Sequence, residues 1–299
     1  MATPPFSPLI DLADGNRIPQ LGLGVYKVED SRAAALVEGA IDAGYRHIDT
    51  AKLYFNEAGV GAGVRASGVP REELFVTTKV WNDDHGYDET LRAFDTSLGL
   101  LGLDYVDLYL IHWPSPRQNR YVETWRALET LKADARVRSI GVSNFTGAHL
   151  ERLAAGSTVV PAVNQIELHP YFAQKQNEAA NTARGIVTQA WSPIGGITFY
   201  PGWSDGTGKN PLTDPVIAAI GAVHGKTNAQ VMLRWHLQQG RSVIPKSVRP
   251  ERIAENIDVF DFELSGVQLA QIDALDLGVR GGPDPDAVRK PGQFTIPEN

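Results

Sequence analysis

The stretch Tyr45-Arg-His-Ile-Asp49-Thr-Ala-Lys-Leu-Tyr54 joins a short apolar run to polar residues, and a helical pattern follows it. Residues 45–49 have the length and composition of a buried strand, and residues 59–67 have the apolar spacing of a helix. A carboxylate at the end of a buried strand is costly unless a cation meets it, because burial penalises its charge. Asp49 therefore predicts a strand-then-helix unit and a cationic partner elsewhere in the chain.

The same order of strand and helix repeats through the whole sequence. Eight apolar runs are expected to be strands: residues 20–24, 45–49, 74–78, 105–111, 139–143, 162–165, 186–190 and 242–244. Helical spacing is found at residues 33–43, 59–67, 87–99, 121–133, 148–155, 175–184 and, as two helices, 214–239. With no linker between the units, the pattern predicts one (β/α)8 TIM barrel domain over residues 1–299, since an open doubly wound sheet usually has about six strands.

Three shorter segments add detail to this barrel. Residues 8–19 alternate around Asp14-Gly15 and predict a β-hairpin that caps the N-terminal end, or bottom, of the barrel. Gly22-Leu-Gly24 resembles the start of a dinucleotide-binding G-x-G-x-x-G motif, but Lys27 replaces the third glycine and no helix begins at Gly24, which disfavours a Rossmann fold. Residues 194–196 and a C-terminal loop at about 278–299 are expected to cover the site.

Composition excludes several classes of function. The net charge of −7, without a clustered basic run, argues against nucleic acid or an anionic membrane as partner. The absence of cysteine excludes disulfides, thiolate catalysis, zinc–cysteine sites and iron–sulfur clusters. The N-terminus lacks the pattern of a signal peptide, and no apolar run approaches about 18 residues. We therefore expect a cytoplasmic protein, and the scattered histidines indicate no metal site.

Polar residues stand at the C-terminal ends of the predicted strands, where barrels of this type carry their active sites. They are Asp49 and Tyr54, Lys79, His112, Ser143 and Asn144, Gln165, Trp191 and Ser192, and Lys246 and Ser247. Each alone has an ordinary explanation, such as a buried core histidine or a helix cap. As a set they indicate one mouth, at which Asp49 pairs with Lys79 because either charge would be costly to bury alone.

This pairing predicts an acid–base site. An ammonium beside the Tyr54 hydroxyl would lower the pKa of that phenol from its usual value of about 10 and ease proton transfer at neutral pH. His112 would donate a hydrogen bond to the substrate carbonyl oxygen that receives this proton, and would fix the orientation of that oxygen.

The ordered motifs resemble those of the aldo-keto reductase family along nearly the whole chain. The matching segments are residues 44–51 with 54–57, Thr78-Lys-Val-Trp81, Leu110-Ile-His-Trp-Pro114, Ile140-Gly-Val-Ser-Asn-Phe145, Asn164-Gln-Ile-Glu167 and Ile244-Pro-Lys-Ser-Val248. The chain is particularly similar to the compact bacterial branch that includes 2,5-diketo-D-gluconate reductases. The resemblance implies NADPH-dependent reduction of aldehydes and ketones, such as small dicarbonyls and keto-sugars, with Tyr54 as general acid and Asp49, Lys79 and His112 completing a tetrad.

The resemblance also implies how the cofactor is held. Trp191, where many relatives have tyrosine, would stack on the nicotinamide, while Ser143, Asn144 and Gln165 would bind its carboxamide. Further cofactor contacts are expected from Gly24, Val25, Tyr26, Ser192, Pro193, Lys246, Ser247, Val248, Arg249, Arg252, Glu255 and Asn256.

The segment Lys246-Ser-Val-Arg249-Pro-Glu-Arg252 can be interpreted physically. Its cations stand at the start of a helix, with Pro250 suited to the first turn, so guanidinium groups, backbone N–H groups and the helix dipole would together bind phosphate. The alternative is a solvated basic helix start. The resemblance implies that the 2′-phosphate of NADP binds here, with Glu255 and Asn256 near the adenine. Arg249 stands where many family members have threonine, and it should strengthen binding of the 2′-phosphate.

The substrate side is less defined by the sequence. Tyr26, Trp81, His112 and Trp113, with Phe55, are expected to form an aromatic cleft, although each aromatic also suits ordinary packing. Two other functions remain open: a cofactor-binding regulatory or sensing subunit with weak turnover, and a metal-dependent hydrolase using His112, His169 and carboxylates. The family resemblance implies a monomer.

Overall fold

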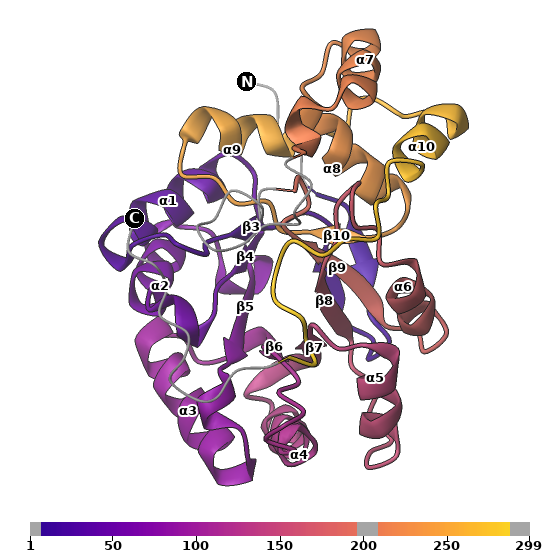
Figure 1. Cartoon of the computed structure of the whole chain (residues 1–299). Helices are drawn as coiled ribbons and strands as arrows, with labels where there is room; N and C mark the ends of the chain where they lie inside the picture. Colours follow the sequence, from indigo (N-terminus) through magenta and orange to yellow (C-terminus); the bar gives the residue numbers. More distant parts are fainter. Residues whose placement is uncertain (1–6, 196–208, 288–299) are drawn as a thin grey trace.

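The computed structural model describes residues 7–195 and 209–287, and its centre is a parallel sheet (Figure 1). Eight strands pair in chain order: β3 (Leu23–Gly24), β4 (His47–Asp49), β5 (Phe75–Val80), β6 (Val106–Ile111), β7 (Val137–Ser143), β8 (Val163–Glu167), β9 (Val187–Trp191) and β10 (Ser242–Val243). The two edges meet, because the N–H of Gly22 donates to the Val243 carbonyl at 2.9 Å and the N–H of Val243 donates to the Gln20 carbonyl at 2.8 Å. The sheet therefore closes, which confirms the predicted (β/α)8 barrel.

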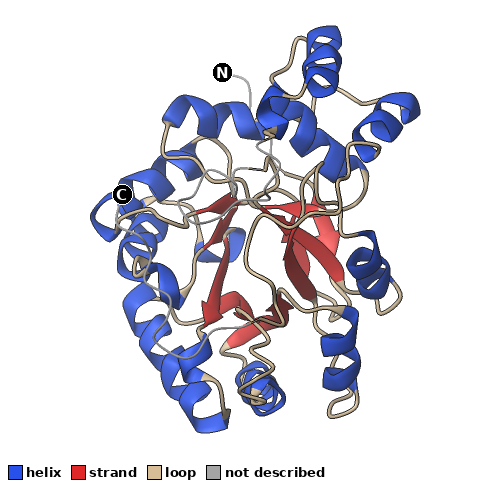
Figure 2. Cartoon of the chain, viewed as in Figure 1, coloured by secondary structure: helices blue, strands red, loops and turns tan. Residues whose placement is uncertain are grey.

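Helices surround the strands (Figure 2). They are α1 (Asp30–Asp42), α2 (Glu57–Ala66), α3 (Tyr87–Leu101), α4 (Tyr121–Ala133), α5 (Gly147–Ala154), α6 (Lys175–Thr182), α7 (Pro215–His224), α8 (Asn228–Gln238), α9 (Pro250–Ile257) and α10 (Gly266–Asp273). Short 3-10 turns lie at η1 (Lys52–Tyr54), η2 (Arg71–Glu73), η3 (Asn82–Asp84) and η5 (Pro211–Thr213). The predicted helices are all present, whereas α10 was not anticipated by the sequence analysis.

The hairpin of β1 (Leu9–Asp11) and β2 (Arg17–Pro19) covers one end of the barrel. Leu12 and Ile18 pack in a buried cluster with residues at the beginnings of strands, among them Phe75 and Val163. The Asn16 side chain donates to the Arg138 carbonyl at 3.0 Å, near the beginning of β7. The hairpin thus caps the N-terminal end, as predicted, and leaves the C-terminal ends of the strands open.

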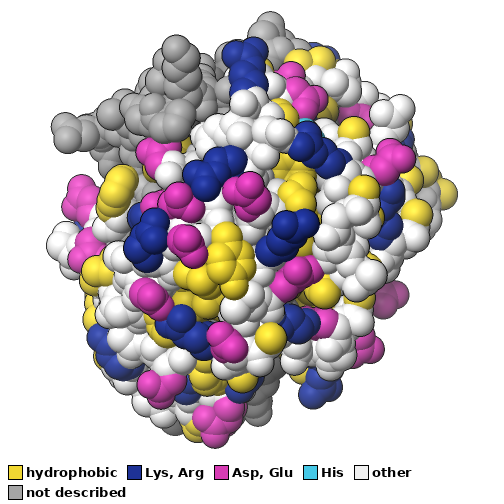
Figure 3. All heavy atoms as spheres, turned by 90° about the horizontal axis from the view of Figure 1, so that it is seen from below, with side chains coloured by type: hydrophobic (Ala, Val, Ile, Leu, Met, Phe, Trp, Pro, Cys, Tyr) yellow, Lys and Arg dark blue, Asp and Glu magenta, His cyan; other side chains and the backbone are white. Residues whose placement is uncertain are grey.

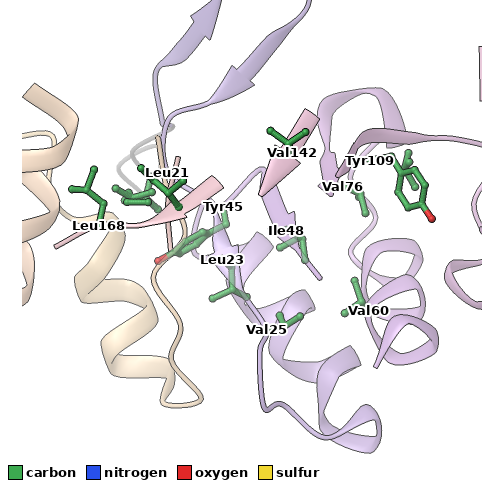
Figure 4. Packing of buried hydrophobic residues seen from close by; sticks show 14 of the residues in the cluster. Leu21, Leu23, Val25, Tyr45, Ile48, Val60, Val76, Tyr109, Val142 and Leu168 are labelled. Carbon is green, nitrogen blue, oxygen red and sulfur yellow. The ribbon is translucent and has the colours of Figure 1, made fainter. Parts of the chain in front are cut away.

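The main hydrophobic core lies between the strands and the helices. Figure 4 shows part of it, with Val25, Ile48 and Val76 from neighbouring segments of the barrel wall and Val60 from α2. These side chains are fully buried, so they hold the wall that carries the strand ends in place.

One face of the molecule is mixed in charge. On the face seen in Figure 3, acidic and basic side chains are interspersed among hydrophobic and other residues. Within residues 7–195 and 209–287, no helix is long and apolar enough to cross a membrane.

Candidate active site

A pocket lies at the C-terminal ends of the strands, opposite the hairpin. Its lining includes many of the predicted site residues: Gly24, Tyr26, Asp49, Tyr54, His112, Trp113, Ser143, Asn144, Gln165, Trp191, Ser192, Pro193 and Lys246. Leu53, Ile194 and Ile244 complete it. Of the predicted covers, Ile194 lines the pocket and Gly195 is described, while Gly196 and residues 288–299 lie outside the described residues.

Asp49 meets the cation that its position in the sequence predicted. Lys79 Nζ, on β5, donates to Asp49 Oδ1 at 2.6 Å and to the Thr50 carbonyl at 2.8 Å. Both side chains are almost fully buried. Burial lowers the pKa of Lys79 and raises the pKa of Asp49, and the attraction between the two charges opposes both shifts. The two residues therefore form a compensated ion pair at the pocket, with Asp49 in the lining and Lys79 behind it.

Tyr54 stands above this pair. It ends the short turn η1, after which Phe55 adopts a left-handed φ of 54°. Lys79 Nζ lies 5.1 Å from the centre of the Tyr54 ring. The ring also packs at 5.0 Å from Tyr26 and at 5.7 Å, edge-on, from His112. The phenol thus lies in the pocket with the ammonium below it and an imidazole beside it.

His112 follows the last residue of β6 and is neutral. Burial holds the pKa of His112 well below its usual value, and the positive charge of Lys79 lowers it further. Trp81 packs edge-on against the His112 ring at 5.2 Å. A neutral imidazole held in this way is suited to hydrogen bonding with a polar substrate atom rather than to supplying a positive charge.

The expected aromatic cleft is only partly formed. Tyr26 and Trp113 line the pocket, whereas Trp81 contacts His112 and is not part of the lining. Phe55 is 75% exposed and also stands outside it. Phe55 is exposed because it follows the turn η1, where its left-handed backbone directs the chain away from Tyr54.

The predicted amide-binding residues form a connected group. Asn144, at a left-handed φ of 63°, donates from Nδ2 to the His112 carbonyl at 3.0 Å and to Ser143 Oγ at 3.1 Å. Trp191 Nε1 donates to Asn144 Oδ1 at 2.9 Å. Gln165 Nε2 donates to Asp49 Oδ2 at 2.7 Å. These bonds link one wall of the pocket to the Asp49–Lys79 pair.

The basic segment lies where α9 begins. Pro250 is the first helical residue, and the backbone N–H of Arg249, at the N-cap, donates to Ser247 Oγ at 3.1 Å. Arg249 and Arg252 are exposed, and Val248 is half-buried. Further along α9, Glu255 accepts a hydrogen bond from Thr227 and Asn256 is buried.

Two cations near Lys246, Lys27 and Arg32, were not predicted from the sequence as part of the site. Burial lowers the pKa of Lys246, and the nearby positive charges of Lys27 and Arg32 lower it further. Three cations whose fields reinforce one another make an anion more favourable there. Their position shortly after Gly24, in the loop and helix that follow the first barrel strand, was the available signal.

These features fit an extended dinucleotide carrying phosphate. Amide and indole side chains line one part of the pocket, while cations and a helix N-terminus lie at Lys246 and beyond. Gly24 is required for the wall between them, because a Cβ at this position would stand 2.9 Å from the Ile244 carbonyl oxygen. Val25 is buried behind this wall rather than in the lining.

In the part of the chain that the structure describes, no group of three or more histidine, aspartate or glutamate side chains could hold a metal ion. His169, the second histidine of the hydrolase alternative, lies 3.2 Å from Glu167 Oε1.

The chain is similar to known proteins over most of its length. The model of the aldo/keto reductase family matches residues 20–277. A morphine 6-dehydrogenase of Pseudomonas putida is 59% identical over 93% of this chain and 95% of its own length. A methylglyoxal reductase of Yersinia pestis is 49% identical over 93% of this chain and 96% of its own length. The solved NADPH complex of a Gox0644 variant is 46% identical with a TM-score of 0.87, covering 95% of this chain and 99% of that one.

Proposed function

Because the chain belongs to the aldo/keto reductase family and is an NADPH-dependent carbonyl reductase, we propose that Tyr54 donates the proton that completes carbonyl reduction. A nicotinamide held in this pocket would supply hydride for the carbonyl carbon, and Tyr54 would protonate the carbonyl oxygen. Asp49, Lys79 and His112 complete the tetrad.

One observation carries this proposal: the buried Lys79 ammonium, held by Asp49 at 2.6 Å, lies 5.1 Å from the ring centre of a pocket tyrosine. A nearby positive charge stabilises the phenolate that remains when the proton leaves. Neutral His112, edge-on to the same ring, would hydrogen-bond the substrate oxygen and orient it. The pocket lining provides the space in which that oxygen would reach both groups.

Replacing Tyr54 with Phe tests the proton donor. Tyr54→Phe should lower kcat by about 10²- to 10⁴-fold, the usual contribution of a general acid, and leave the Kd for NADPH within a few fold. NADPH oxidation and quenching of tryptophan fluorescence measure the two quantities. Tyr87→Phe, at an exposed position on α3, is the matched control and should keep wild-type turnover. Full activity in Tyr54→Phe would end the assignment.

For the 2′-phosphate of NADPH we propose Arg249 and Arg252, with Lys246 and Ser247 beside them. Hydrogen bonds to a charged group contribute about 1.5–3 kcal/mol each, so Arg249→Ala combined with Arg252→Ala should raise the Kd for NADPH by at least about tenfold. The Kd for NADH, which lacks this phosphate, should hardly change. Arg92→Ala, on the exposed side of α3, serves as the control. Equal weakening of both nucleotides would contradict the phosphate role.

The proposed substrates are small dicarbonyls and keto-sugars. The relative that is a methylglyoxal reductase supports the small dicarbonyls. The 59% identical morphine 6-dehydrogenase also makes a bulky alicyclic ketone or alcohol a second candidate. Steady-state NADPH oxidation with methylglyoxal, a keto-sugar and a polycyclic ketone would rank the three. Binding of NADPH without turnover on any of them would favour the regulatory alternative.

We further propose that residues 1–299 act as one domain and as a monomer in the cytoplasm. Light scattering that gives the mass of a single chain, before and after NADPH is added, would support the monomer.

A further inference from the structure

Four polar side chains form a row inside the barrel on neighbouring strands. Ser143 pairs in register with Gln165, Gln165 with Gln189, and Gln189 with Ser242. Residues that are paired across parallel strands point to the same face of the sheet, so this row runs across β7, β8, β9 and β10 on one side of the wall. Gln165 is in the pocket lining, and Gln189 and Ser242 are fully buried beside it.

Hydrogen bonds join this row to Asp49. Gln165 Nε2 donates to Asp49 Oδ2 at 2.7 Å and to Gln189 Oε1 at 2.7 Å. Gln189 Nε2 in turn donates to Ser242 Oγ at 2.9 Å. Asp49 Oδ1 is the partner of Lys79. A single buried chain of contacts therefore runs from Lys79 through Asp49 and Gln165 to Ser242.

The two hydrogens of the Gln165 amide determine how this side chain is oriented. An amide NH₂ has two hydrogens, and both are used, one by Asp49 and one by Gln189. The other polar atom, Gln165 Oε1, is an acceptor, and among the described residues it has no hydrogen-bond partner. Because Gln165 lines the pocket, this acceptor is available to a ligand that donates an N–H.

A Gln189 amide rotated so that its oxygen and nitrogen change places would break this order of donors and acceptors. A reversed Gln189 would present NH₂ to the NH₂ of Gln165, and a buried donor without an acceptor costs about 1–3 kcal/mol. The direction of the network is set at Asp49, because an ionised carboxylate only accepts and therefore takes an amide hydrogen of Gln165. Gln189 Oε1 holds the second amide hydrogen of Gln165, and the bond from Gln189 Nε2 to Ser242 Oγ holds Gln189 in place.

We propose that Gln189 and Ser242 are positioning residues that hold the Gln165 amide with Oε1 toward the pocket, so that the site selects a primary amide on its cofactor. The inference rests on the proposed cofactor contact of Gln165. It goes beyond that contact, because neither Gln189 nor Ser242 lines the pocket.

The test compares NADPH with its reduced 3-acetylpyridine analogue, in which a methyl group replaces the amide NH₂. Quenching of tryptophan fluorescence gives the Kd of each, and the ratio of the two Kd values measures recognition of the amide. The wild-type protein should bind NADPH about tenfold more tightly than the analogue, the effect of one acceptor left unpaired. In Gln189→Met, which keeps the volume of the side chain, the ratio should fall to about two or less, because the second amide hydrogen of Gln165 loses its acceptor and the amide plane can rotate about the remaining bond to Asp49.

Further variants separate positioning from general damage. Ser242→Ala should lower the ratio in the same direction, while Gln189→Glu, which keeps an oxygen toward Gln165, should retain it. Gln165→Met should lose the discrimination, and Gln189→Met added to it should cause no further loss, because both act on one contact. Thermal unfolding identifies variants that fold, and for a Gln189→Met protein that does not fold, Ser242→Ala decides.

Several outcomes would overturn the inference. A wild-type ratio retained in both Gln189→Met and Ser242→Ala, or additive losses in the double variant, would show that Gln189 does not act through Gln165. If Gln165→Met loses discrimination while Gln189→Met keeps it, the inference fails and the proposed cofactor contact stands. If Gln165→Met itself keeps full discrimination, both fail.

Discussion

At the scale of single residues, Asp49 determines how the buried charges are arranged. Its two carboxylate oxygens are engaged separately, one by Lys79 and one by Gln165. Breaking a buried ion pair by removing one partner is strongly destabilising, because the remaining charge is left in the interior without compensation. Removing both charges avoids that penalty, which allows stability and catalysis to be tested apart.

Lys79→Met should therefore lower the free energy of unfolding by about 3–5 kcal/mol and abolish turnover. Asp49→Asn combined with Lys79→Met should recover most of the lost stability without recovering turnover, because the ammonium beside Tyr54 is still absent. Urea unfolding and NADPH oxidation measure the two effects. An active double variant would mean that the proton leaves Tyr54 without help from Lys79.

A second prediction at this scale concerns His85, which is buried and has a pKa lowered to about 3 by burial and by the charge of Arg120. In the unfolded chain its pKa is about 6.5. Below that pH the unfolded state binds a proton that the native state does not, so stability is complete above pH 6.5 and is lost as the pH falls toward about 3. The slope from this one group is at most about 1.4 kcal/mol per pH unit.

His85→Leu should flatten the fall in stability by up to that amount between about pH 6 and pH 4, relative to the wild-type protein. Urea unfolding at several pH values measures the slope. From about pH 7.5 upward, where His85 is neutral in both states, the difference in the free energy of unfolding between the two proteins should not change with pH. Parallel curves through the acidic range would show that His85 gains its proton without unfolding.

At the scale of elements, helix α2 shows why close packing can override helix propensity. Its sequence carries Gly59, Gly61 and Gly63, which weaken an isolated helix. In the barrel, a Cβ at Gly63 would lie 2.5 Å from the Ala34 carbonyl oxygen of α1, and one at Gly61 would lie 1.8 Å from the Leu101 carbonyl oxygen. The glycines therefore permit α2 to pack tightly between its neighbours.

Gly63→Ala should lower the free energy of unfolding by about 1–3 kcal/mol, even though alanine is the better helix former, because α1 must move away. Gly39→Ala is the matched control on α1: a Cβ there meets nothing within 4 Å, so it should stabilise the protein by about 0.5–1 kcal/mol. Thermal or urea unfolding compares the pair. Stabilisation by both changes would show that the contact between α1 and α2 adapts freely.

The elements were largely predictable because their apolar periods are regular. Helix α4 begins and ends where the sequence pattern does, at residues 121 and 133, while β3 is regular only over Leu23–Gly24. Helix α10 was missed, although Ser265 and Gln268 form a capping box at its start. Strand-end residues such as Asp49 and Gln165 could be found because parallel strands bring their C-terminal ends together.

Gln189 and Ser242 could not be found in the same way. Each lies within a short strand, and its partner in the neighbouring strand depends on the register of the barrel, which the sequence pattern does not specify. Lys27 and Arg32, whose charges act on Lys246, were missed for a related reason, because a loop and a helix bring them near that residue.

At the scale of the whole molecule, the chain after α10 returns across the rim of the barrel, as Figure 1 shows. Leu277 donates its backbone N–H to the Tyr171 carbonyl at 3.0 Å, and Asp286 lies 3.0 Å from His149 on α5. Between them, the fully buried Glu167 at the end of β8 accepts the N–H groups of Gly281 at 2.8 Å and Gly282 at 2.9 Å. One carboxylate thus attaches the segment 278–287 to the end of the barrel that carries the pocket.

Glu167→Gln should release this segment. The neutral amide has one acceptor oxygen in place of two, so the N–H of either Gly281 or Gly282 loses its partner, and nearby Arg280 loses a counter-charge 3.7 Å away. A lost partner costs about 1–3 kcal/mol, so amide hydrogen exchange in residues 278–287 should quicken by about five- to a hundredfold while exchange in β5 and β6 stays unchanged. Glu151→Gln, exposed on α5, is the control and should alter neither region. Unchanged exchange in Glu167→Gln would mean that Asp286 and Leu277 attach the segment instead. Faster exchange throughout the barrel would mean that Glu167 supports the strands as well as the segment.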